Sequence, residues 1–169
     1  MADAETWALL LVRVGLGAVM LVHGWNHWRG KGGIEGTAGW FAGLGLSKPR
    51  LQAWFSVLTE IGAGALLVVG LGTPLACAAV VGVMLVAGLL AHRRNGFFVF
   101  KDGYEYVLVL TLVAVALAAF GPGEASLDEA AGIAVTDWAG AGIALGAGVA
   151  GTAALLAVFY RPKPAASES

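Results

Sequence analysis

Two ionisable residues lie inside apolar segments of this chain, where a charge needs a partner or a function. Arg13 is seven residues into the first apolar segment, and Glu60 is close to the middle of the second. At the centre of a bilayer each charge would cost about 2.5–3.5 kcal/mol on the insertion scale. Their depths differ by only a few residues, so we expect the two side chains to pair. Such a pair either fixes the register of two helices or forms part of a ligand or proton site.

A second group of ionisable residues comprises His23, His27, His92 and Glu105. His23 and His27 are four residues apart and share a helix face, and alternation of the spans places all four residues near the same membrane boundary. Three imidazoles and a carboxylate are suited to bind a metal or haem, or to hydrogen-bond a quinone carbonyl. Simple stabilisation of helix ends is the alternative, since cations favour C-termini and anions favour N-termini.

The segments that carry these residues are long enough to cross a membrane. Hydrophobic residues make up 59% of the 169-residue chain and charged residues 12%, against about 25% charged in a soluble domain. A spanning helix needs roughly 17–25 apolar residues. The sequence therefore predicts an all-α membrane protein, a four-helix transmembrane bundle plus a fifth C-terminal transmembrane helix. The expected spans are residues 6–25, 51–71, 73–91, 104–120 and 138–160.

Short motifs indicate how these spans are connected. Residues 70–72 end one helix, and Thr73 is expected to cap the next, which makes spans two and three an antiparallel hairpin. Residues 37–46 are expected to form a short helix in the membrane interface. Ser126 and Glu129 have capping-box spacing, which predicts a short helix before the fifth span.

The basic residues predict an orientation. Nine of the ten Lys and Arg residues fall on one side of the five-span topology, and Arg13 is the exception. The positive-inside rule then places the N-terminus outside and the C-terminus in the cytoplasm of a multi-pass protein of the cell membrane. A net charge of −1 gives no reason to expect nucleic acid, and the single Cys77 cannot form an intrachain disulfide.

The fifth span is rich in Gly and Ala. Gly142 and Gly146 have the GxxxG spacing that lets helices approach closely in lipid. These glycines are expected either to pack within the bundle or to contact another subunit.

Several motifs in order resemble the DoxX family of small bacterial membrane proteins. The resemblance covers roughly residues 8–128, and no single motif carries it. The matching pieces are Arg13-x-Gly15-Leu16-Gly17 with His23-Gly24, Gly36 to Phe41, Leu44 to Leu46, Glu60 to Gly64, Gly70 to Pro74, Met84 to His92, Asn95 to Phe98, Tyr104 to Tyr106, and Gly121 to Gly123 with Ser126 to Asp128.

The resemblance implies a four-helix membrane core and a link to redox metabolism. Some family members are linked to thiosulfate:quinone oxidoreductase and others to sulfur or oxidative-stress metabolism. The chain would then divide into a DoxX-like core (1–128), an additional Gly/Ala-rich helix (129–161) and a polar tail (162–169). His27 departs from the family, which often has Lys near this point. The polar residues that fall on the family's motifs are Arg13, His23, Glu60, His92 and Glu105.

Three functions remain open on this basis. The first is a redox-linked membrane subunit, such as a subunit of a quinone-linked oxidoreductase, with a quinone as candidate cofactor and other redox proteins as partners. The second is a non-catalytic scaffold that docks partner proteins or associates with itself through the fifth span. The third is a haem or metal site at the cytoplasmic boundary, for which the metal is unknown.

Overall fold

The computed structural model of the chain describes residues 3–162, so all but the first residue of the predicted polar tail lies outside the described range. Its α-helices are α1 (Ala4–Arg29), α2 (Gly33–Gly43), α3 (Pro49–Val69), α4 (Thr73–Ala87), α5 (Glu105–Phe120), α6 (Leu127–Ala130) and α7 (Asp137–Phe159). Short π and 3-10 turns follow α4, namely η1 (Gly88–His92), η2 (Arg93–Asn95) and η3 (Val99–Lys101).

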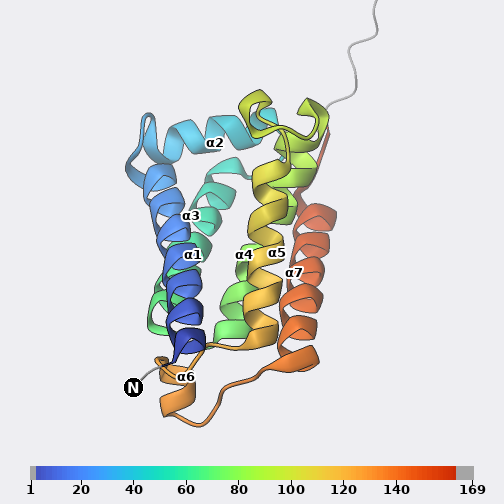
Figure 1. Ribbon diagram of the computed structural model, residues 1–169. Coiled ribbons are helices and arrows are strands. Elements are labelled where there is room, and N and C mark those ends of the chain that lie inside the picture. Colours follow the sequence, from blue (N-terminus) through green and yellow to red (C-terminus); the bar gives the residue numbers. More distant parts are fainter. Residues whose placement is uncertain (1–2, 163–169) are drawn as a thin grey trace, which may run out of the picture.

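The long helices run side by side and form one bundle (Figure 1); they are α1, α3, α4, α5 and α7. The short helix α2 lies across one end of the bundle, and α6 lies at the other end, where the chain begins. Both short helices were predicted, and the side chain of Ser126 accepts a hydrogen bond from the backbone N–H of Glu129, as its capping-box spacing indicated. We refer below to the α2 end and the α6 end of the bundle.

The lengths of the helices define a membrane protein. Four helical segments are long and apolar enough to span a bilayer, with α4 continuing through η1 and η2 to Asn95. The fifth, α5, is apolar but has only 16 residues. The predicted all-α membrane fold is therefore confirmed, and the fourth expected span is the shortest of the five.

Small residues set the closest contact in the bundle, between α1 and α3. A Cβ atom on Gly17 would lie 2.8 Å from the carbonyl oxygen of Gly64, and one on Gly24 would lie 2.7 Å from the side chain of Ile61. No side chain fits at either position, so the two backbones approach directly. At Gly24 this approach places the last turns of α1 against the middle of α3.

Helix α7 is built into the bundle through small residues. Gly148 packs against Val81 of α4, and the hydroxyl of Thr152 donates to the carbonyl of Gly82 at 3.2 Å. At the α2 end, the backbone N–H of Ser47 donates to the carbonyl of Phe159 at 2.8 Å. These contacts tie the expected additional helix to the rest of the fold.

Of the two roles expected for the glycine pair of α7, packing within the bundle is not the one observed. Gly142 and Gly146 are exposed, and a Cβ on either would have no atom within 4 Å among the described residues. The packed face of α7 is instead the one with Gly140, Ala144 and Gly148. Both faces have four-residue spacing of small residues, so spacing alone did not distinguish the packed face from the outer one.

The cap of α4 also differs from the prediction. Thr73 is the first residue of the helix rather than its cap, and Gly72 holds the capping position with a positive φ of 59°. The backbone N–H groups of Gly72 and Thr73 instead donate to the carboxylate of Asp128, at 2.6 and 2.8 Å. A carboxylate from another helix thus satisfies the N–H groups that a local cap usually serves.

Candidate functional site

The structure separates Arg13 from Glu60, and the expected ion pair between them does not form. The guanidinium of Arg13 donates to the backbone carbonyls of Pro122 and Ala125, at 2.9 and 2.5 Å. Both carbonyls belong to the loop between α5 and α6, at the α6 end. Arg13 reaches that loop rather than α3 because its long side chain extends toward the nearer end of its own helix.

Arg13 and Asp128 together close the α6 end. The side chain of Arg13 is 1% exposed and that of Asp128 is also 1% exposed. Asp128 lies in the electrostatic field of Arg13, and its carboxylate caps α4 while its backbone N–H donates to the carbonyl of Gly70. A buried cation and a buried anion thus hold α1, the α3–α4 turn and the last loop in one arrangement.

Glu60 has a different environment, nearer the α2 end. Its side chain is 2% exposed. One carboxylate oxygen accepts a hydrogen bond from the hydroxyl of Ser56, one turn earlier on α3. The other oxygen, Oε2, has no hydrogen-bond partner within the described part of the chain.

His27 is the nearest basic group to Glu60, with 3.7 Å between its Nε2 atom and the Oε1 atom of Glu60. The hydroxyl of Thr37 donates to the backbone carbonyl of His27 and lies 3.4 Å from its Nδ1 atom. Because that hydroxyl proton is already used, Nδ1 is the nitrogen that carries a proton in the neutral ring. Nε2 is then free to accept a proton on the side that faces Glu60.

These groups line one end of a cavity of about 400 Å³. This volume is within the range of small-molecule sites, about 300–1,000 Å³. The cavity lies between α3, α4 and α7, and α2 covers its polar end. Its polar lining consists mainly of His27, Gln52, Ser56, Thr59, Glu60 and Thr152, and the rest of its wall is apolar or Gly.

Gln52 is the polar residue that our reading of the sequence missed. It is 2% exposed, and neither its amide oxygen nor its amide nitrogen has a partner among residues 3–162. The sequence did contain evidence for Gln52, because Gln52, Ser56 and Glu60 follow one another at intervals of four and so share one face of α3. Three polar residues on one face of an apolar helix indicate a site more specifically than a single Glu60 does.

Aromatic rings from α2 cover the polar end of the cavity. The His27 ring is stacked on that of Trp40, with 6.1 Å between ring centroids and 16° between planes. Phe41 lies at the same centroid distance in a tilted arrangement. Helix α2 therefore places flat apolar surfaces beside the polar groups of α1 and α3.

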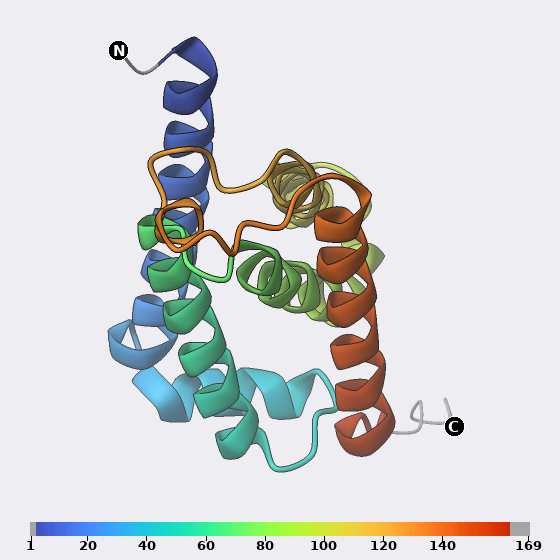
Figure 2. The same cartoon turned by 90° about the horizontal axis from the view of Figure 1, so that it is seen from below.

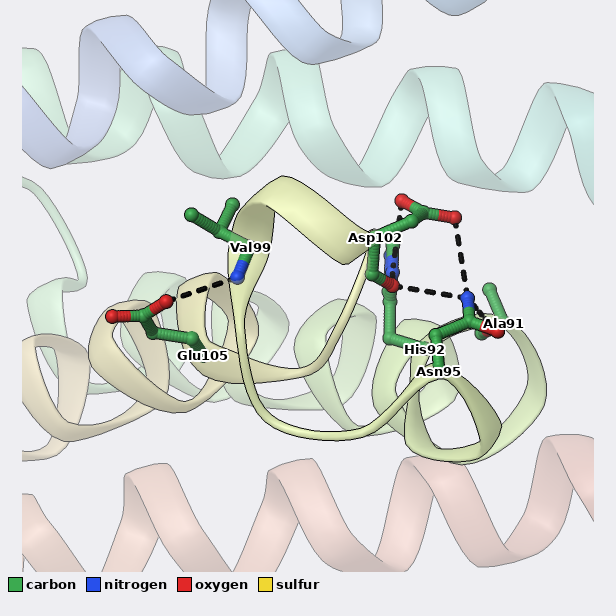
Figure 3. A network of polar contacts seen from close by, with 6 residues as sticks. All are labelled: Ala91, His92, Asn95, Val99, Asp102 and Glu105. Carbon is green, nitrogen blue, oxygen red and sulfur yellow. Dashed lines mark hydrogen bonds and ion pairs between the residues drawn. The ribbon is translucent and has the colours of Figure 1, made fainter.

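The other three members of the second predicted group lie at the α2 end but do not converge on one point. These residues are His23, His92 and Glu105. The Nδ1 atom of His92 is 2.8 Å from the carbonyl oxygen of Asp102, and Glu105 accepts a hydrogen bond from the backbone N–H of Val99 (Figure 3). His23 is stacked on Tyr106, with 6.0 Å between ring centroids. In these contacts His92 and Glu105 hold the loop between α4 and α5.

The metal or haem hypothesis finds no preformed ligand set. Among residues 3–162, no group of three or more His, Cys, Asp or Glu side chains is placed to hold a metal ion. His92 is turned toward its own loop, so the three imidazoles do not share a centre. The single Cys77 is fully buried in the bundle.

The fold and the cavity define a small multi-pass helical membrane protein with an internal binding cavity. Residues 8–93 match the sequence model of the DoxX family. The chain therefore belongs to the DoxX family. The match covers α1 to α4 and ends before α5, so the extension of the family core to residue 128 stays a prediction. No curated protein and no solved structure matched the chain.

Proposed function

We propose that this DoxX-family protein is a quinone-binding subunit of a membrane redox system, with its quinone ring at the polar end of the cavity. One observation carries this proposal: Gln52 and Glu60, which line the same largely apolar cavity, carry three buried polar atoms that have no partner among residues 3–162. Leaving a buried polar atom unpaired costs about 1–3 kcal/mol. A ligand that pairs with them recovers that free energy on binding.

The donor and acceptor pattern of these atoms suits a quinone and its reduced form. The amide nitrogen of Gln52 donates, which matches a quinone carbonyl. The amide oxygen of Gln52 and Oε2 of Glu60 accept, which matches the hydroxyl of a quinol. Trp40 and Phe41 add flat apolar surfaces at this end of the cavity, where a planar ring can stack.

Glu60, His27 and Ser56 are the residues we expect to handle protons. When bound, a quinone supplies a two-electron couple that takes up two protons on reduction. Glu60 can hold one proton on Oε1, the carboxylate oxygen that lies 3.7 Å from Nε2 of His27, and these two groups can exchange it. His27 also contacts Thr37 of α2. These residues would therefore form a proton path from the cavity toward the α2 end.

The electrons would come from a partner redox protein at the α2 end. This end carries Arg29, Arg50, Arg93 and Arg94, all outside or at the limits of the spans. By the positive-inside rule it faces the cytoplasm, with the N-terminus outside. A cytoplasmic or membrane-bound oxidoreductase with an acidic surface is the partner we expect.

The test is quinone binding to the purified protein in lipid nanodiscs, followed by quenching of tryptophan fluorescence. The proposal predicts saturable binding to the unmodified chain and about tenfold weaker binding, a loss of about 1.4 kcal/mol, for both Gln52→Leu and Glu60→Gln. Glu35→Gln is the matched control, because Glu35 pairs with Arg50 on the surface, with both side chains more than 70% exposed. Mass spectrometry of co-purified lipids checks for a native quinone.

Two results would overturn the proposal. One is an unmodified protein that neither carries a quinone after purification nor binds an added one. The other is equal binding by all four proteins, which would place the quinone away from Gln52 and Glu60.

A further inference from the structure

The cavity is much longer than its polar end. Its lining residues on α4 run from Leu75 to Ala87, a distance of about 18 Å at the rise of an α-helix. The polar residues of α3 lie along only part of this length, and Leu75 is near the α6 end of the bundle. A ring bound at Gln52 and Glu60 would therefore leave most of the cavity for another part of the ligand.

Small residues bring α4 and α7 into direct contact, and the remaining space of the cavity lies beside this contact. Ala78 and Gly82 of α4 face Gly148 of α7, which lies so close that its Cβ would be 2.7 Å from Val81. Gly151 lines the same cavity, and a Cβ at this position would have no atom within 4 Å among the described residues. The result is a narrow apolar slot with open space beside Gly151.

The slot opens between α3 and α7. These helices lie on either side of α4 (Figure 2), and each is long and apolar enough to span a membrane. Phe55 of α3 is 47% exposed, and Ala147 and Gly151 of α7 are also exposed, although all three line the cavity. An opening between two membrane-spanning helices faces lipid tails rather than water.

We infer that the ligand carries a long apolar chain, that this chain lies in the slot alongside α4, between α3 and α7, and that the ligand enters sideways from the bilayer between these two helices. The occupant is thus a chain-bearing, membrane-dissolved molecule rather than a water-soluble ring. This inference rests on the proposed function for the identity of the ring. It makes α7, which lies outside the family match, part of the binding site.

Bulky residues at the slot give a direct test. Gly151→Leu places a side chain where the structure has open space, and it also raises helix propensity, so the variant should fold. Gly146→Leu is the matched control, because it makes the same change on the outer face of the same helix, away from the cavity. Ala147→Leu is a second blocking variant.

The measurement compares two ligands in nanodiscs: a benzoquinone without a chain and one with a decyl chain. The inference predicts that Gly151→Leu and Ala147→Leu weaken binding of the decyl quinone about tenfold. Both should bind the chainless quinone about as the unmodified protein does. Gly146→Leu should match the unmodified protein with both ligands.

The outcomes separate this inference from the proposed function. Equal binding of the decyl quinone by all variants would overturn the slot while leaving the ring site in place. An equal loss of affinity for both ligands would also overturn the slot, because the blocked positions would then belong to the ring site. Absence of binding by the unmodified protein would overturn the proposed function first, and the slot with it.

Discussion

Arg13 and Glu60 are both buried ionisable residues of membrane-spanning helices, but the protein surrounds them in opposite ways. Arg13 donates to two loop carbonyls and lies near the charge of Asp128, although its Nε atom has no partner among residues 3–162. Glu60 has one partnered oxygen and one that faces a cavity. The first arrangement resembles a structural clasp, and the second resembles a site prepared for a ligand.

The contrast between Arg13 and Glu60 shows how to distinguish a structural charge from a candidate functional charge in a membrane bundle. A charge within a spanning helix is by default a functional candidate, and both residues qualified on that ground. What separates them is whether neighbouring groups complete their hydrogen bonds. Each of the following experiments tests that separation.

The largest effect is expected at the α6 end, from Asp128→Ala. This change removes the carboxylate that caps α4 and leaves the backbone N–H groups of Gly72 and Thr73 without their partner, at a cost of about 1–3 kcal/mol for each buried group. We expect a clear fall in the unfolding temperature of the purified protein in detergent. Glu129→Ala, at the exposed neighbouring position, should change it little. If the two variants unfolded alike, Asp128 would not be a clasp.

A smaller effect is expected from Gly24→Val, which forces α1 away from α3. The new side chain would collide with Ile61 and approach Glu60, and overpacking of this kind costs about 1–3 kcal/mol. Because His27 follows one turn later, quinone binding should weaken as well. Gly15→Val, with no atom within 4 Å of its Cβ among residues 3–162, is the control. Unchanged binding would show that the α1–α3 approach does not build the site.

The smallest effect on stability is expected from Glu60→Met, although Glu60 is as buried as Arg13. The change keeps a similar volume and removes an unpaired acceptor together with the hydrogen bond from Ser56, and one hydrogen bond contributes only about 0.5–1.5 kcal/mol net. We expect the unfolding free energy to change by no more than about 1 kcal/mol while quinone binding falls. A loss as large as that of Asp128→Ala would mean that Glu60 is also a structural clasp.

Much of the architecture could be predicted because lipid imposes strict rules on sequence. The apolar segments gave the spanning helices, and residues 37–46 and Ser126 indicated the two short ones, since both signals are local. The partners of Arg13 could not be predicted in the same way, and the expected pair with Glu60 is wrong. Such pairing depends on which end each long side chain reaches, and a loop more than one hundred residues away supplied the partners of Arg13.

The candidate site shows the same limit. The sequence singled out Glu60, and the four-residue spacing of Gln52, Ser56 and Glu60 was there to be read. The sequence grouped His27 with His23, His92 and Glu105, yet it lies beside Glu60 because Gly24 allows α1 and α3 to touch. His92 and Glu105 have the right chemistry and the right end of the bundle, but their loop takes up their hydrogen bonds.

The sequence by itself determined that this protein is a helical bundle of the membrane and a member of the DoxX family, because hydrophobic length and motif order are properties of the chain alone. Two further facts depend on tertiary packing: α7 lines a cavity together with α3 and α4, and Glu60 rather than Arg13 lies at this cavity. The physical reason is that hydropathy is read residue by residue, whereas the satisfaction of a buried charge depends on atoms brought from distant parts of the chain.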